Sequence, residues 1–215
     1  HYPLRRQRQM CIRDRGYVAG VIGWAAVNLS FAPYLTGMGQ REITQFAQML
    51  IYEFSQLTSA RGGQAMFTDI HLYWDIPKHI GDLPIVGPGG QLTEKPCKAY
   101  EEEARQFAWA LFDVYKKGDG TGKPFIFPRP ILHVTADFFA SPGHDAFLEH
   151  VCDVSIERGN PCFVFDRADT QIRTVLGHAF PLRDEEWASP WLSRYFAIQN
   201  VTLNFPRLAY RAQGD

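Results

Sequence analysis

The chain has 215 residues, 46% of them hydrophobic, which is enough for one large domain or two small ones. Its formal net charge of -1 gives no electrostatic basis for binding nucleic acid or an anionic membrane. The apolar stretch at residues 18–26 is too short for a membrane-spanning helix and lacks a signal cleavage site. No pair of cysteines has CxxC spacing, so we expect reduced thiols in a cytoplasmic protein. The four cysteines are Cys11, Cys97, Cys152 and Cys162.

The first fifteen residues, HYPLRRQRQMCIRDR, differ from the rest of the chain. They hold five arginines and one acidic residue, with neither helical nor strand periodicity. A basic arm for nucleic acid is one interpretation, but nothing else in the chain is basic. We therefore interpret residues 1–15 as a non-native or disordered tail and begin the folded domain, 16–215, after it.

The first half of the domain predicts a helix, a strand, a loop and a second helix. Apolar residues recur at helical spacing over 40–57, and strand formers dominate 65–74. Glycine and proline are dense in 81–96, as in an ordered loop. A second helix follows over 100–114, with acidic residues in its first turn and Thr93 as a possible cap.

The second half predicts three further strands around a third helix. The strands are expected at 131–138, 162–166 and 200–206, the last limited by Pro206. The helix between the first two opens at Ser141-Pro142 and closes at Gly159. Short apolar strands that alternate with helices predict an α/β architecture, with parallel strands buried on both faces.

Two adjacent glycines stand where the first helix meets the first strand, in the run Arg61-Gly62-Gly63-Gln64. A helix stop needs only one glycine in the left-handed conformation. Two glycines flanked by donors indicate that a ligand is held close to the backbone. The alternative is a plain helix stop with a solvated arginine.

Two glycine-rich segments resemble phosphate-binding loops, and both are better interpreted as turns. In GDGTGKP (118–124) only three residues separate the first glycine from the Gly-Lys pair, and proline follows the lysine. A P-loop needs four residues there, a following Ser or Thr, and a preceding strand. GPGG (87–90) lacks a strand before it and a helix immediately after it.

The histidines give no sequence evidence for a metal site. His144 and His150 are six residues apart on one predicted helix, so they lie on different faces. His133 lies in a predicted strand, where a buried, hydrogen-bonded histidine is the default interpretation.

Four separate blocks in register resemble the anaerobic, class III ribonucleoside-triphosphate reductases. They are ARGGQAMFTDIHL, GKPFIFPRPILHVTADFF, RGNPCFVFDR and FAIQNVTLNFPRLAYRAQGD, and GWAAVNLSFAPYL precedes them as in that family. The resemblance runs from about Gly16 to the C-terminus. It implies that residues 16–215 are a partial catalytic barrel domain. The whole barrel would have ten strands of the glycyl-radical-enzyme type, in two half-barrels around a finger loop.

The resemblance also implies radical chemistry and its partners. In the family, a glycyl radical made by an S-adenosylmethionine-dependent iron–sulfur activase generates a thiyl radical on a finger-loop cysteine. The thiyl radical abstracts the ribose 3′ hydrogen, and the 2′ hydroxyl leaves as water in a closed site. We expect a ribonucleoside triphosphate, the radical-activating enzyme and a second copy of the full-length chain as partners. We expect no cofactor held by this chain itself.

The resemblance assigns substrate-binding roles to six residues. Arg61, Gly62, Gly63 and Gln64 would lie at the barrel mouth, where Arg61 meets phosphate and the glycines allow close approach. Asn200 and Asn204 would project from one side of a strand toward sugar hydroxyls. Local turn bonding by these asparagines is the alternative.

The chain departs from the family at the finger loop. The interval between Arg167 and Gln199 contains no cysteine, so we assign no catalytic residue. Cys162 precedes that interval and is a poor substitute, because a thiol's role depends on its placement. The family's nucleotide-sensing domain and glycyl-radical segment are also not in this sequence.

These departures leave three hypotheses open. The chain is a fragment of a reductase, a non-catalytic nucleotide-binding or scaffold protein that keeps the barrel, or a generic α/β small-molecule binder. Under the first two, we expect the isolated chain not to reduce ribonucleotides.

Overall fold

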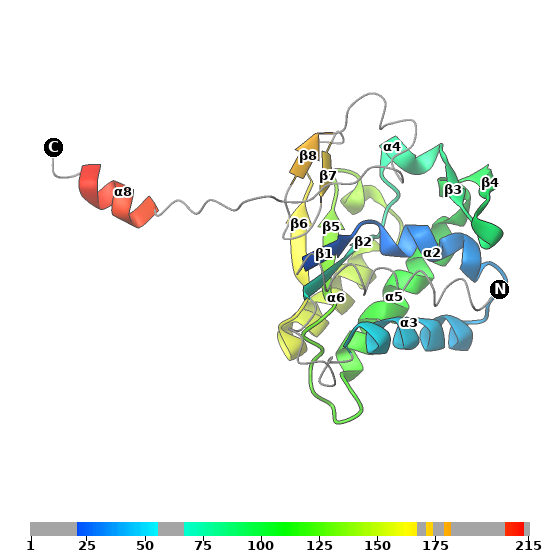
Figure 1. Cartoon of the computed structure of the whole chain (residues 1–215), viewed down its shortest axis with the longest axis horizontal. Helices are drawn as coiled ribbons and strands as arrows, with labels where there is room; N and C mark the ends of the chain where they lie inside the picture. The colour runs from blue at the N-terminus through cyan, green and yellow to red at the C-terminus, as the bar shows by residue number, and fades with distance from the viewer. Residues whose placement is uncertain (1–20, 56–66, 167–170, 174–178, 182–204, 213–215) are drawn as a thin grey trace.

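The computed structural model describes residues 21–55, 67–166, 171–173, 179–181 and 205–212. A four-stranded sheet in the order β1-β2-β5-β6 forms its centre, and every neighbouring pair of strands is parallel (Figure 1). The strands are β1 (Val21–Trp24), β2 (Phe67–Tyr73), β5 (Arg129–Val134) and β6 (Cys162–Phe165). Because helices separate these strands in the sequence, each parallel pair is joined by a helical crossover. The expected α/β class with parallel strands is confirmed.

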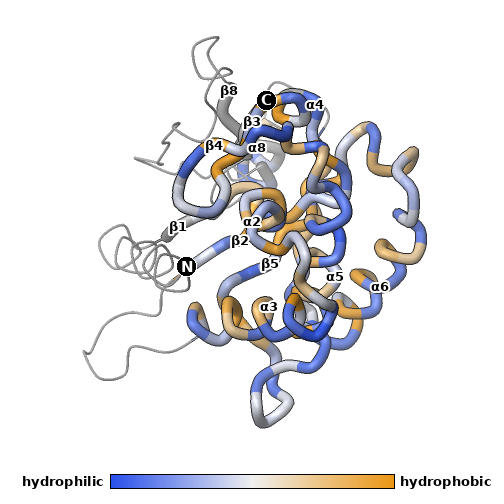
Figure 2. The backbone as a smooth tube through the Cα atoms, turned by 90° about the vertical axis from the view of Figure 1, so that its right-hand side faces the viewer, coloured by the Kyte–Doolittle hydropathy of each residue, from blue (hydrophilic) through white to orange (hydrophobic). Residues whose placement is uncertain are grey.

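Three helices cover one face of this sheet (Figure 1): α3 (Gln40–Ser55), α5 (Glu101–Lys117) and α6 (His144–Arg158). Hydrophobic residues alternate with hydrophilic ones along these helices, so each has an apolar side for the core (Figure 2). The strands contribute Ile70, Leu72, Leu132 and Val134 to the same buried cluster. Burial of each such side chain contributes about 1.5–3 kcal/mol. This cluster holds the sheet rigidly from its helical side.

The predicted helices are confirmed, although one cap and one start are not: α6 begins at His144, after Gly143, and not at Ser141-Pro142. α3 begins at Gln40 as expected, and α6 ends at Gly159, whose φ of 71° is the left-handed conformation favoured by glycine. α5 begins at Glu101, one residue after the expected start. Thr93 does not cap it. Its hydroxyl instead accepts from the backbone N–H of Ile85 and donates to the carbonyl of Lys95.

Of the four predicted strands, 67–73 and 162–165 are confirmed within the ranges 65–74 and 162–166. The range 131–138 is wrong at both ends, because β5 starts at Arg129 and stops at Val134. Thr135 ends the strand: its hydroxyl accepts from the N–H of Asp137, and its carbonyl accepts from the N–H of Phe138. Phe138 consequently lies in the 3₁₀ turn η4 (Phe138–Ala140).

The fourth predicted strand, 200–206, is wrong at its end. Residues 200–204 lie outside the described residues, and helix α8 (Phe205–Ala212) begins immediately after them. Pro206 thus occupies the first turn of a helix, where its missing N–H costs nothing. A proline that limits a strand and a proline that opens a helix look the same in sequence.

Several short elements were not predicted. β1 and α2 (Val27–Leu35) form within the apolar segment that precedes α3. The expected loop 81–96 contains a hairpin of β3 (Pro84–Val86) and β4 (Leu92–Pro96), joined by the turn η2 (Pro88–Gly90). These elements have too few residues to show a periodicity.

Four further short elements complete the described chain: α4 (Lys78–Gly81), η3 (Cys97–Tyr100), and the antiparallel pair β7 (Gln171–Arg173) and β8 (Ala179–Pro181). Across the described residues, every helix is too short or too polar to cross a bilayer.

Candidate functional site

The face of the sheet opposite the helices carries polar side chains that are nevertheless buried. Side chains alternate along a strand, so Asp69, His71 and Tyr73 project away from the face that Ile70 and Leu72 present to the helices. Asp69 is 2% exposed and His71 is fully buried. Buried polar groups of this kind are costly unless they are hydrogen-bonded or serve a function. We call this surface the polar face.

Three residues on the polar face form a hydrogen-bonded relay across β2, β5 and the end of β6. Nδ1 of His71 lies 2.7 Å from Nε2 of His133, and Nδ1 of His133 lies 2.5 Å from a carboxylate oxygen of Asp166. Both imidazoles are fully buried. Tyr73 stacks on the ring of His133 with centroids 4.2 Å apart, which fixes the orientation of that imidazole. The three groups form the relay Asp166–His133–His71.

Hydrogen bonding sets the tautomers of the relay. The carboxylate of Asp166 only accepts, so Nδ1 of His133 donates to it. In the neutral imidazole of His133, Nε2 must then accept from the Nδ1–H of His71. Burial, followed by the nearby His133, lowers the pKa of His71 to about 3, which keeps its imidazole neutral. Nε2 of His71 therefore carries a lone pair, and it has no hydrogen-bond partner in the described structure.

A charged pair lies on the same face, nearer the amino ends of the strands. Nε and Nη2 of Arg129 donate to the two carboxylate oxygens of Asp69 at 3.0 and 2.8 Å. This bidentate bond raises the pKa of Arg129 above its ordinary value. The pair links β2 to β5 directly below the relay, because Asp69 and His71 are two residues apart on one strand.

Cys162 belongs to the polar face as well. It opposes Ile131 in the β5–β6 register, on the side that carries Arg129 and His133. Its side chain is half-buried. Cys162 is therefore an ordinary residue of the sheet in the described structure.

The carboxyl ends of β2 and β5 carry a second buried carboxyl group. Asp75 is 6% exposed, and one of its oxygens accepts from the hydroxyl of Thr135 at 2.6 Å. Burial raises the pKa of Asp75 above its ordinary value. In parallel sheets, ligands bind at this edge. The carboxyl end of the sheet, next to the relay, therefore carries Asp75, Thr135 and Asp166.

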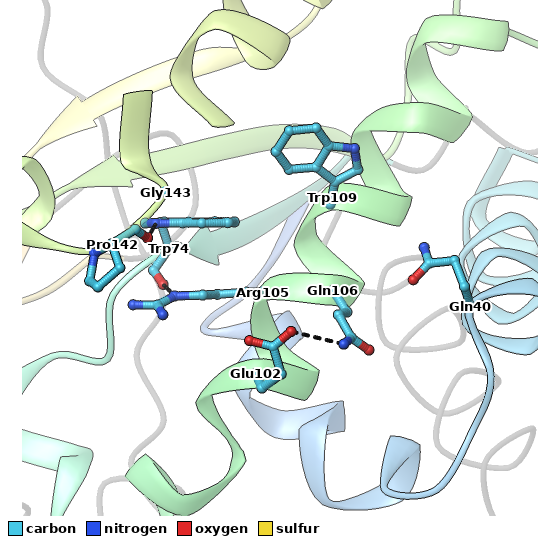
Figure 3. A pocket seen from close by; sticks show the side chains of 8 residues that line it. All are labelled: Gln40, Trp74, Glu102, Arg105, Gln106, Trp109, Pro142 and Gly143. Carbon is cyan, nitrogen blue, oxygen red and sulfur yellow. Dashed lines mark hydrogen bonds between the residues drawn. The ribbon is translucent and has the colours of Figure 1, made fainter. Parts of the chain in front are cut away.

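A pocket of about 520 Å³ lies on the helical side of the sheet, away from the polar face (Figure 3). Its polar groups bond to one another. Nε1 of Trp74 donates to the carbonyl of Pro142, Nε of Arg105 donates to the carbonyl of Trp74, and Nε2 of Gln106 donates to Glu102. The pocket thus offers a ligand few unsatisfied groups. We take the polar face as the candidate site.

The two turn predictions are confirmed. In 118–124, a carboxylate oxygen of Asp119 accepts from the backbone N–H groups of Thr121 and Lys123, which uses the amides that a phosphate would need. In 87–90, the N–H of Gly87 bonds to the carbonyl of Gln91 and closes the β3–β4 hairpin. The expectation that no strand precedes 87–90 is wrong, because β3 ends at Val86.

His144 and His150 make separate contacts on α6, as their six-residue spacing predicts. His144 bonds to the carbonyl of Ser141, whereas His150 stacks on Trp109. No cluster of three or more potential metal ligands occurs among the residues that the structure describes.

The six predicted substrate-binding residues, Arg61, Gly62, Gly63, Gln64, Asn200 and Asn204, lie outside the described residues, so their roles stay predictions. The prediction that His133 is a buried, hydrogen-bonded histidine is confirmed. Its partners, His71 and Asp166, were not predicted. A usable signal was present: Asp69, His71 and Tyr73 alternate with apolar residues in β2. That pattern marks a strand with one polar face.

Comparison with known proteins identifies the family. The sequence profile described as anaerobic ribonucleoside-triphosphate reductase matches residues 9–215, nearly the whole chain. The chain belongs to the anaerobic ribonucleoside-triphosphate reductase family. The predicted resemblance is thereby confirmed. No curated protein sequence matches this chain significantly.

Solved structures of Thermotoga maritima anaerobic ribonucleotide reductase share its fold. The complex of that enzyme with dATP and CTP superposes with a TM-score of 0.52 at 11% identity, over 77% of this chain and 28% of the other. The structure with dATP in the specificity site gives 0.50 at 12% identity, over 77% and 29%. This chain spans less than a third of the length of these relatives. The described part of this chain supplies four parallel strands of the barrel expected for this family.

Proposed function

We propose that this chain is part of the catalytic barrel of an anaerobic ribonucleoside-triphosphate reductase and binds a ribonucleoside triphosphate on its polar face. The observation that carries the proposal is the family match over residues 9–215. The structure adds a reason for the place of binding. The polar face holds a half-buried ion pair and a buried relay, whereas the helical face is an ordinary hydrophobic core.

The substrate contacts that we propose combine described and undescribed residues. Arg61 would meet the phosphates, with Gly62, Gly63 and Gln64 allowing close approach of the backbone. Asn200 and Asn204 would hold sugar hydroxyls. The described polar face would then lie beside the ribose, because the run 61–64 shortly precedes β2, the strand that carries Asp69 and His71.

The chemistry of the whole enzyme is also a proposal for this chain. It would reduce ribonucleotides to deoxyribonucleotides by thiyl and glycyl radicals, with an iron–sulfur activating enzyme and a second copy of the full-length chain as partners. No residue between Arg167 and Gln199 is a cysteine. Because no side chain in that interval can form a thiyl radical, this chain would bind substrate without turning it over.

That missing thiol favours a second candidate, a non-catalytic nucleotide-binding or scaffold protein that keeps the barrel. Both candidates require binding of a ribonucleotide or retention of its binding face. They differ only in whether a radical cysteine acts on the bound substrate.

Calorimetric titration with ATP, CTP, GTP and UTP, beside an anaerobic turnover assay with activating enzyme and reductant, tests the proposal. We expect binding of at least one nucleotide and no deoxyribonucleotide product. Arg61→Ala should weaken binding roughly tenfold, as the loss of one charged hydrogen bond does. Arg41→Ala, at an exposed site on α3, is the matched control and should bind as the parent does. Turnover would contradict the argument from the missing cysteine, and absence of binding would contradict the proposed site.

A further inference from the structure

The end of the relay at His71 is incomplete. Every other ring nitrogen of the two imidazoles has a hydrogen-bond partner, but Nε2 of His71 has none in the described structure, although its ring is fully buried. Buried acceptors are nearly always satisfied, by protein, water or ligand. The two hydrogen bonds of the relay orient the imidazole of His71 and leave the lone pair on its Nε2 as the one unpaired acceptor of the relay's rings. The arrangement therefore points to a donor that arrives from outside the described chain.

We propose that Nε2 of His71 accepts a hydrogen bond from a ribose hydroxyl of the bound nucleotide, with His133 and Asp166 as positioning residues. The inference rests on the proposed function, because that function supplies the ribose. It deepens the function by naming the group that would accept a hydrogen bond from the substrate. The ionised phosphate oxygens of a nucleoside triphosphate only accept, whereas the ribose hydroxyls are donors that all four ribonucleotides share.

The relay fixes the tautomer that presents this lone pair. Nδ1 of His133 donates to the carboxylate of Asp166, 2.5 Å away, so Nε2 of His133 accepts from the Nδ1–H of His71 at 2.7 Å. Nε2 of His71 then carries no proton and can only accept. Burial lowers the pKa of His71, so its imidazole stays a neutral acceptor and the hydroxyl keeps its proton.

The position of the relay agrees with this role. His71 and His133 lie in the carboxyl halves of β2 and β5, and Asp166 directly follows β6, so the relay is near the edge where parallel sheets bind ligands. The groups that act on His71 electrostatically are His133, Asp166 and Arg129, and Tyr73 covers the ring of His133. The atoms that cover Nε2 of His71 form no hydrogen bond with it, so the hydroxyl would displace them on binding.

Long-range ¹H–¹⁵N spectra of the histidine-labelled chain test the inference, with ATP, CTP, GTP and UTP as probes and their 2′-deoxy and 3′-deoxy analogues as comparisons. In the free chain we expect Nε2 of His71 to be unprotonated and Nδ1 of His133 to carry a proton. The nucleotide that binds should shift the Nε2 resonance of His71, and one of its two deoxy analogues should bind without that shift. His71→Phe should weaken binding of the ribonucleotide roughly tenfold and the binding of that deoxy analogue much less.

Two variants separate positioning from mere support of the fold. Asp166→Asn keeps the shape and removes the charge, so we expect retained binding and an upfield shift of the proton between residues 133 and 166. His144→Gln, outside the relay, should leave both binding and the His71 resonance unchanged. Binding that leaves the Nε2 resonance in place, or that all analogues shift equally, would overturn the inference alone. Failure of every nucleotide to bind would overturn the proposed function and this inference with it.

Discussion

The side-chain amide of Asn28 pairs with the backbone of Tyr73 as a neighbouring strand would. Its nitrogen donates to the carbonyl of Tyr73 at 2.7 Å, and its oxygen accepts from the N–H of Tyr73 at 3.1 Å. The same nitrogen also donates to the carbonyl of Ala104 at 3.1 Å. Asn28 is fully buried, so one side chain on α2 joins the end of β2 to the start of α5. The last residue of β2 is thereby held in line with His71.

Replacement of Asn28 should destabilise the fold. Asn28→Ala leaves the buried N–H and C=O of Tyr73 without these partners, which should lower the free energy of unfolding by about 2–4 kcal/mol. Asn28→Asp keeps the acceptor and loses both donated bonds; we expect a loss at least as large, because a fully buried carboxylate would face the carbonyl oxygens of Tyr73 and Ala104. Urea unfolding followed by circular dichroism measures both. Equal stability of the parent and Asn28→Ala would show that water or local rearrangement replaces the amide.

The bond between Asp69 and Arg129 should couple β2 to β5. We expect a coupling free energy of about 1–3 kcal/mol, because the bond is bidentate and Asp69 is nearly fully buried. A double-mutant cycle of Asp69→Asn, Arg129→Gln and the double variant measures it from unfolding free energies. Strict additivity of the two single losses would contradict a stabilising role for this pair.

Stability should depend on pH through His71. Burial lowers the folded-state pKa of His71 to about 3, below the ordinary histidine value of about 6.5 in the unfolded chain. The unfolded state therefore binds more protons between these values, and stability falls as pH is lowered from about 6.5 toward 3, by up to about 1.4 kcal/mol per pH unit.

His71→Gln removes this titration and should show a shallower loss of stability over the same pH range. Unfolding midpoints measured from pH 7.5 to 4.5 for both proteins give the comparison. Parallel curves would mean that His71 is not held neutral by burial. The difference between the curves matters, because other groups titrate in both proteins alike.

The cysteines should differ in reactivity according to their burial. Cys97 is 4% exposed, and burial raises the pKa of its thiol to about 11, so it should react with a maleimide only when the chain unfolds. Cys152 is exposed on α6 and should react first. Mass spectrometry of alkylated peptides over time orders the sites, and Cys152→Ser should remove the fast phase. Rapid labelling of Cys97 in the folded chain would contradict its placement.

The elements that could be predicted from the sequence are those whose apolar residues repeat over several turns or whose end is marked by a glycine. α3 and α5 have four or more turns, and Gly159 ends α6 in the one conformation that favours glycine. β1 and the strands of the β3–β4 hairpin have five residues or fewer, too few to show a period. β1 forms only because it pairs with β2, which lies far along the chain. Asn28 illustrates the same limit: its partners are 45 and 76 residues away.

The candidate site was harder to predict than the fold. Resemblance to the family supplied Arg61, Gln64, Asn200 and Asn204, all outside the described residues. The relay was not predicted, because its members come from three strands and meet only through the register of a parallel sheet. The alternation in β2 shows that Asp69 and His71 share a face, but it does not show which residues of β5 face them.

A crystal structure of the chain soaked with the ribonucleoside triphosphate that binds most tightly tests the central claim most directly. We predict electron density for the nucleotide on the polar face, with its ribose within hydrogen-bonding distance of Nε2 of His71. Density in the helical-side pocket beside Arg105 and Trp109, with the polar face unchanged, would contradict the claim.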